Sequence, residues 1–122
     1  MIIHNAKTLA YIGDALYELY IRKHLLEQGI QGARLHDETV KFTCAPGQSL
    51  MFEKIKPHLT DQEQTIFKRG RNSELSRKPR NAPLSVHRHA SGLEALFGYL
   101  HLDGDTQRIN QLFTIMFSTD NG

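Results

Sequence analysis

The chain has 122 residues, of which 39% are hydrophobic and 23% are charged, and its formal net charge is +2. These values are ordinary for a globular protein, so we expect one domain over residues 1–122 and exclude a disordered or fibrous chain. No apolar run approaches the roughly 18 residues that a membrane span needs, and the start of the chain does not resemble a signal peptide. The single cysteine, Cys44, cannot form an internal disulfide, which favours a cytoplasmic protein.

The basic residues are concentrated in one part of the chain. Between Lys68 and His89 there are seven basic residues and one acidic residue, Glu74, whereas the rest of the chain has eight basic and twelve acidic residues. A stretch of this kind is often only a solvated loop. Its charge density nevertheless favours contact with a polyanion.

The first half of the chain shows the hydrophobic spacing of three helices. Asn5 is a suitable N-cap for a first helix, which runs to about Gln28. A short helix is predicted from Leu35 to Cys44. A third begins around Pro46, where a first-turn proline is tolerated, and ends before Pro57.

Three further helices are predicted in the second half. The capping box Thr60–Glu63 begins a fourth helix, and Gly70–Ser85 is expected to be an exposed, mobile loop. An apolar helix is predicted over Val86–Leu102, and Asp105 caps a last one. Because no segment alternates with the period of a strand, we predict an all-α domain of about six helices.

Two acidic residues lie on helices that are otherwise apolar. Asp14 lies in the first helix, which is apolar on most of its circumference, and Glu94 lies eighty positions later. A buried carboxylate is costly unless a cation, a donor or a metal compensates it. Lys7 or Arg22 could pair with Asp14. Glu94 could instead close a capping box with Ser91.

Together, the two acids and the basic stretch are typical of a divalent-metal site that acts on a phosphodiester. Mg²⁺ takes a few carboxylates and is completed by water and substrate phosphate. Acids in a structural ion-pair network would give the same pattern. A zinc site at His87, His89 and His101 is a weaker hypothesis, because paired ligand spacing is lacking.

Two motifs resemble those of the ribonuclease III family. Residues 9–18 read Leu-Ala-Tyr-Ile-Gly-Asp-Ala-Leu-Tyr-Glu and resemble the signature helix of its catalytic domain. Residues 94–98 read Glu-Ala-Leu-Phe-Gly and resemble its second acidic motif. The similarity covers nearly the whole chain. It is greatest to the short form, Mini-ribonuclease III, which consists of the catalytic domain alone.

The resemblance implies a fold, an activity and partners. It implies an all-helical homodimer that hydrolyses double-stranded RNA with Mg²⁺, leaving 5′-phosphate and 3′-hydroxyl ends. Asp14 and Glu94 match the catalytic, metal-binding acids. For the short form it further implies maturation of the ends of 23S ribosomal RNA precursor. A ribosomal protein bound to that substrate would be a further partner.

The sequence also departs from the family pattern. Acids of the standard enzyme fall on Lys7, Ala10 and Ser91 here, which favours a single Mg²⁺ held by the two remaining acids. Glu18 is typical of the short form, but its role is open. The alternative is a non-catalytic duplex-RNA-binding or ribosome-assembly module. Since no residues remain for a double-stranded-RNA-binding domain, we expect the following residues to contact the duplex: Arg69, Arg71, Lys78, Arg80 and Arg88.

Overall fold

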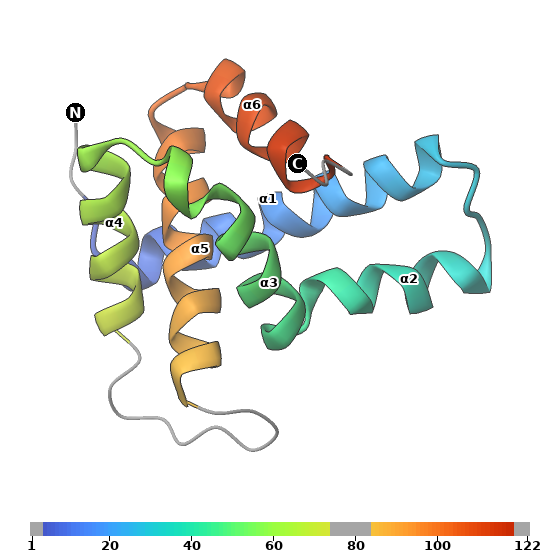
Figure 1. Cartoon of the computed structure of the whole chain (residues 1–122), viewed down its shortest axis with the longest axis horizontal. Helices are drawn as coiled ribbons and strands as arrows, with labels where there is room; N and C mark the ends of the chain where they lie inside the picture. The colour runs from blue at the N-terminus through green and yellow to red at the C-terminus, as the bar shows by residue number, and fades with distance from the viewer. Residues whose placement is uncertain (1–3, 74–83, 119–122) are drawn as a thin grey trace.

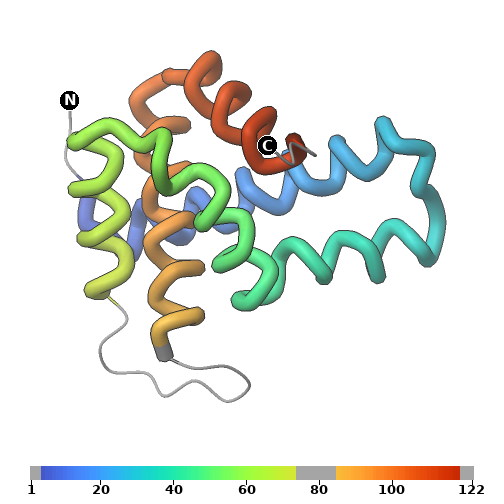
Figure 2. Tube along the Cα trace, in the orientation of Figure 1, coloured from blue at the N-terminus to red at the C-terminus, as the bar shows by residue number. Residues whose placement is uncertain are grey.

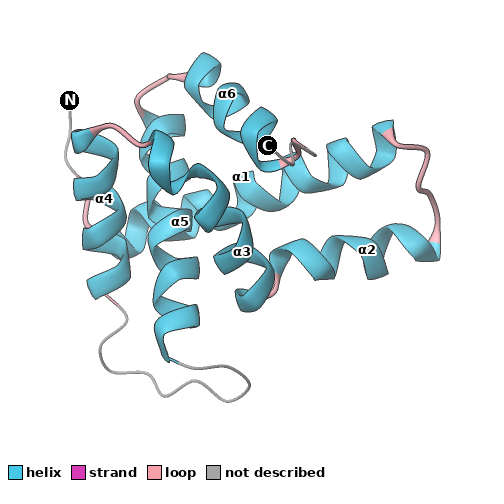
Figure 3. Cartoon of the chain, in the orientation of Figure 1, coloured by secondary structure: helices cyan, strands magenta, loops and turns pink. Residues whose placement is uncertain are grey.

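The computed structural model describes residues 4–73 and 84–118, and every regular element in these ranges is helical (Figure 1, Figure 3). The all-α prediction is therefore confirmed over the described ranges. The elements are α1 (Ala6–Glu27), α2 (Ala33–Thr43), α3 (Ala45–Ile55), the 3-10 helix η1 (Lys56–His58), α4 (Asp61–Asn72), α5 (Leu84–Leu102) and α6 (Thr106–Met116). None of these helices is long and apolar enough to cross a membrane.

Three predicted N-caps are confirmed by hydrogen bonds. The Asn5 side chain accepts from the Thr8 amide at 2.8 Å, and the Asp105 side chain accepts from the Arg108 amide at 3.2 Å. At α4, both halves of the capping box of Thr60 with Glu63 are present. These ends are set by contacts within one turn, so local sequence is enough to predict them.

Other helix boundaries differ from the prediction. α2 begins two residues before Leu35, and α5 begins at Leu84, two residues before Val86. α4 continues through Gly70 to Asn72, where a loop was predicted. Gly70 is buried against α5, and this tertiary contact overrides its low helix propensity. The rest of the predicted loop, residues 74–83, lies outside the described residues, and so do Lys78 and Arg80.

Helix α5 is the central element of the fold. It contacts α1 most extensively, and it also packs on α3, α4 and α6 (Figure 2). α1 passes α5 at a steep angle and continues beyond it, where it runs beside α2 (Figure 1). α1 buries one residue per turn, as an amphipathic helix should. Its buried residues are Leu9, Gly13, Tyr17, Ile21 and Leu25, and those of α5 that pack against them include Leu93, Leu96, Phe97 and Leu100.

Glycines allow α1 and α5 to cross with their backbones in contact. A Cβ added at Gly13 would stand 1.6 Å from the carbonyl oxygen of Glu94, and one added at Gly98 would stand 1.8 Å from that of Leu9. No real side chain fits at either position. The two motifs that the sequence singled out therefore meet at this crossing.

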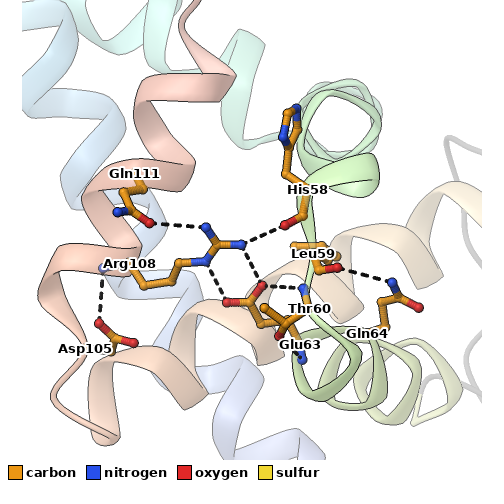
Figure 4. A network of polar contacts seen from close by, with 8 residues as sticks. All are labelled: His58, Leu59, Thr60, Glu63, Gln64, Asp105, Arg108 and Gln111. Carbon is orange, nitrogen blue, oxygen red and sulfur yellow. Dashed lines mark hydrogen bonds and ion pairs between the residues drawn. The ribbon is translucent and has the colours of Figure 1, made fainter.

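An ion pair fastens α6 to α4 (Figure 4). Arg108 donates from Nε to one carboxylate oxygen of Glu63 at 2.8 Å and from a terminal nitrogen to the other at 2.9 Å. The same guanidinium reaches the His58 carbonyl at 2.8 Å. Burial raises the pKa of Glu63, but the hydrogen bonds from Arg108 and Thr60 outweigh it, and the pKa is lowered overall.

Candidate active site

Glu94 lies inside α5 and is half-buried, and its backbone carbonyl lies against Gly13 of α1. The capping-box alternative for this residue is wrong, because α5 begins at Leu84 and Ser91 is an interior residue of the helix. Its side chain is bound from α3 instead: Gln48 Nε2 donates to Glu94 Oε2 at 3.2 Å. Glycines near Glu94 let two helices approach closely, α1 at Gly98 and α4 at Gly92.

Asp14 follows directly on the glycine that touches the Glu94 backbone. The fold thus brings the two predicted acids, eighty positions apart in sequence, to one helix crossing. The expectation that Asp14 is buried is wrong, because it lies on the exposed side of α1. Apolar spacing alone could not show this, since two large apolar residues of the same helix, Tyr11 and Leu19, are also exposed, at 80% and 53%. An exposed carboxylate needs no compensating charge in the single chain.

Arg22, one of the two cations considered for Asp14, pairs with Glu18 one turn earlier on α1. Among the described residues, the Asp14 carboxylate forms no ion pair and no hydrogen bond. Glu18 thus has a local partner of its own.

The described residues contain no group of three or more His, Cys, Asp or Glu side chains that could hold a metal. The three histidines considered for zinc therefore do not form such a group. His101 is exposed, and the His89 ring contacts Ser49 Oγ at 3.1 Å. Asp14 and Glu94 supply two carboxylates, which leaves room for water and phosphate oxygens around an ion.

Basic residues flank the crossing on the α4 side. Arg69 and Arg71 stand on either side of Gly70, whose absent side chain lets α4 approach Ser91 and Ala95. Those two residues lie within one turn of Glu94, so the end of α4, which carries both arginines, packs on the part of α5 that holds Glu94.

Three of the five residues predicted to contact RNA lie within the described ranges, and they differ in their contacts. Arg69 is exposed and donates to the His4 carbonyl at 3.3 Å. Arg71 is half-buried, and its Nε donates to Asn72 at 3.2 Å. Arg88, on the first half of α5, is half-buried, and its Nε has no hydrogen-bond partner.

Tyr17 is a buried residue of α1 that connects two helices close to the site. It is fully buried on α1, and its hydroxyl donates to the Phe42 carbonyl at 2.8 Å, which ties α1 to the end of α2. Burial raises the pKa of this hydroxyl, and negative charge on Cys44 and on Glu94 acts in the same direction. Tyr17 therefore stays a neutral donor at ordinary pH.

Sequence reasoning missed one residue of the site and misread the use of another. Gln48 is a polar residue in an apolar helix, which is a visible signal, but its partner can be known only from the tertiary structure. Gly13 was noted only as part of a motif. A glycine inside an apolar helix indicates close backbone approach, and that signal could have predicted a helix crossing.

Comparison with known proteins gives one family. The model described as Ribonuclease III domain matches residues 7–105. The Mini-ribonuclease 3 of Symbiobacterium thermophilum is 39% identical over 106 residues, which cover 86% of this chain and 82% of that protein. The Mini-ribonuclease 3 of Streptococcus pneumoniae is 39% identical over 113 residues, which cover 88% of this chain and 87% of that protein.

A solved structure agrees with the sequence comparisons. The crystal structure of protein FN1578 from Fusobacterium nucleatum superposes with a TM-score of 0.84 at 31% sequence identity. The match covers 94% of this chain and 93% of that one. The likeness therefore extends over the whole arrangement of helices.

Proposed function

The chain belongs to the ribonuclease III family and is an endoribonuclease, and from this premise we propose that it cleaves double-stranded RNA with Mg²⁺ bound by Asp14 and Glu94. The observation that carries the proposal is the α1–α5 crossing at Gly13. At this crossing the exposed Asp14 follows the glycine that lies against the backbone of the half-buried Glu94. A site with one open side suits a large substrate such as an RNA duplex.

The donor set fits a hard cation. Asp14 and Glu94 offer carboxylate oxygens, the ligands that Mg²⁺ prefers in proteins. When bound, the ion supplies Lewis-acid chemistry for hydrolysis of a phosphodiester. The chain's own contribution is to hold Glu94 on a rigid central helix and to present Asp14 towards solvent, where a phosphate can approach.

Duplex binding is assigned to the basic residues around the crossing. Arg69 and Arg71 lie at the end of α4 and Arg88 on the first half of α5, the helix that carries Glu94. The proposal also includes Lys78 and Arg80, which lie between them in the sequence. A-form RNA is recognised by shape, phosphates and 2′-hydroxyls, so basic side chains that contact phosphates are enough for sequence-independent binding.

The enzyme is proposed to act as a homodimer through the exposed apolar side chains of α1, with Asp14 outside the contact. Tyr11, Leu19 and Leu26 are 80%, 53% and 52% exposed, and they follow one another at helical spacing along that helix. Large apolar side chains gathered on one face commonly mark a protein–protein interface. Two copies joined there would present two sites to one duplex, so one encounter could cut both strands.

The physiological substrate is proposed from the family resemblance to be the 23S ribosomal RNA precursor, with cleavage at its ends. The setting is then the cytoplasm, in keeping with one unpaired cysteine, Cys44, on the surface. A ribosomal protein bound to the precursor would be a natural partner. Purified precursor, with and without bound ribosomal proteins, tests this part directly: mature 5′ and 3′ ends should appear.

The decisive experiment compares Asp14→Asn and Glu94→Gln with the wild type on long duplex RNA, in Mg²⁺ and in EDTA. Cleavage should require Mg²⁺ and should fall by at least about a thousandfold in both variants, whereas duplex binding and the melting temperature should change little. Glu27→Gln, an exposed acid near the end of α1, is the matched control. Near wild-type cleavage by either site variant would refute the assignment. Duplex binding without cleavage in any divalent ion would favour the binding-module alternative.

A further inference from the structure

We infer that Gln48 is a positioning residue, which acts through Glu94 by holding its carboxylate in the orientation that the metal ion requires. This inference rests on the proposed function, because it assumes that Glu94 is a metal ligand. Gln48 itself touches neither the ion nor the RNA in this proposal.

The carboxamide of Gln48 is fixed at both of its donor positions. The side chain is 1% exposed, and Nε2 donates to Glu94 Oε2 at 3.2 Å and to the Thr43 carbonyl at 3.3 Å. One acceptor lies on α5 and the other at the end of α2, so a single amide group joins three helices. The geometry leaves Gln48 little freedom to turn away from Glu94.

The backbone that carries Gln48 is anchored as well. A Cβ at the preceding Gly47 would stand 2.1 Å from the Lys41 carbonyl oxygen, so the first turn of α3 lies directly against the end of α2. Tyr17 binds the Phe42 carbonyl in the same junction. The amide donor is thus attached to a rigid support.

Stability alone does not explain a glutamine at this position. Its Oε1 is buried and has no hydrogen-bond partner, which costs the folded chain free energy. Methionine has a similar length and volume and would carry no unpaired acceptor of its own, although it would donate neither to Glu94 nor to the Thr43 carbonyl. What glutamine adds is a donor to Glu94.

A neutral donor is the type of group that a metal-binding carboxylate can use. Lysine or arginine at this position would pair with Glu94 and compete with the cation. An amide fixes one oxygen of a side chain that has three rotatable bonds, and it leaves the charge unchanged. Hydrogen-bond partners of metal ligands commonly change metal affinity tenfold to a hundredfold when they are removed.

The test measures Mn²⁺ binding in the absence of RNA, by electron paramagnetic resonance of the free ion. Gln48→Met should raise the dissociation constant for Mn²⁺ by about tenfold to a hundredfold. The control is Thr39→Val, which also removes a buried polar group, one whose Oγ1 donates to the Leu35 carbonyl at 2.6 Å away from Glu94. Thr39→Val should leave the constant within about twofold of the wild type, since a hydrogen-bonding group affects metal binding only when it contacts a metal ligand. A folded Gln48→Met variant with wild-type Mn²⁺ affinity would overturn the inference.

A second measurement does not depend on how the variant folds. In the wild type, the side-chain amide protons of Gln48 should shift on titration with Mg²⁺, with the same midpoint as the backbone amide of Glu94. Amide signals that stay unchanged while Glu94 responds would overturn the inference.

The outcomes also separate this inference from the proposed function. If Mn²⁺ affinity of the wild type does not depend on Asp14 and Glu94, the proposed metal site fails and the inference fails with it. If Asp14→Asn and Glu94→Gln abolish binding and Gln48→Met does not weaken it, only the role of Gln48 is refuted.

Discussion

Gly13 of α1 lies against the backbone carbonyl of Glu94 on α5, so closely that a Cβ at position 13 would stand 1.6 Å from the carbonyl oxygen. Since Asp14 follows Gly13 directly, this contact fixes where the first acid stands relative to the second. The glycine of the first motif therefore allows the two helices to cross in contact, and the aspartate that follows it is placed at this crossing.

Gly13→Ala should be strongly destabilising, although alanine is normally the better helix former by about 1 kcal/mol. The added methyl meets backbone, which cannot move aside, so we expect the free energy of unfolding to fall by about 3 kcal/mol or more. Urea denaturation measures it. Ala15→Ser, an exposed change two positions on, is the control and should cost well under about 1 kcal/mol. A stabilised Gly13→Ala variant would contradict the crossing.

Arg108→Met should loosen the attachment of α6 to α4. It leaves the carboxylate of Glu63, only 5% exposed, without its cation, and it removes the contact with the His58 carbonyl. We expect a loss of about 2–4 kcal/mol, somewhat below the value for a wholly buried pair, because Arg108 is 20% exposed. Chemical denaturation measures the loss. Lys41→Met breaks the solvent-exposed pair with Glu38 and should change stability little.

The same ion pair predicts how stability depends on pH. The pKa of Glu63 is lowered in the folded chain, so its contribution is fully present above the unfolded value of about 4.3 and is lost as the pH falls through the folded value. Unfolding free energies of the wild type and of Arg108→Met, measured between pH 6 and pH 3, should therefore converge on the acidic side. A difference that stays constant below pH 4 would show that Glu63 does not titrate as described.

Replacing Arg69 and Arg71 by Gln should weaken duplex binding equally for all sequences. Each lost phosphate contact should reduce the slope of log K against log salt by about one unit or slightly less. Fluorescence anisotropy on a catalytically inactive Asp14→Asn background gives the slope without cleavage. Lys23→Gln, an exposed change on the second half of α1, should leave the slope unchanged. If the arginine variants keep the wild-type slope, these residues do not contact phosphate.

Leu19→Glu should shift the proposed homodimer towards monomer. The charge is exposed in the single chain but would be buried in the contact between two copies. Sedimentation equilibrium should show the dissociation constant of the dimer raised by at least about a hundredfold. Leu102→Glu changes a residue of α5 that is 44% exposed and should leave assembly intact. A wild type that is monomeric at working concentration and still cuts both strands would contradict the dimer.

The sequence by itself determined the helices and most of their ends. The caps at Asn5, Thr60 and Asp105 and the spacing of apolar residues act within one or two turns, so they can be recognised without knowing the fold. The two acids were also recognisable, as parts of motifs.

Only the tertiary structure decided which side of each helix is covered. Asp14 is exposed although the neighbouring Gly13 lies against α5, and no spacing rule distinguishes two apolar sides of one helix. The bond from Gln48 to Glu94 joins residues 46 positions apart, and α4 continues through Gly70 because α5 fills the space beside it. Contacts between residues so far apart in sequence depend on the packing of the whole chain, and they cannot be predicted from local sequence.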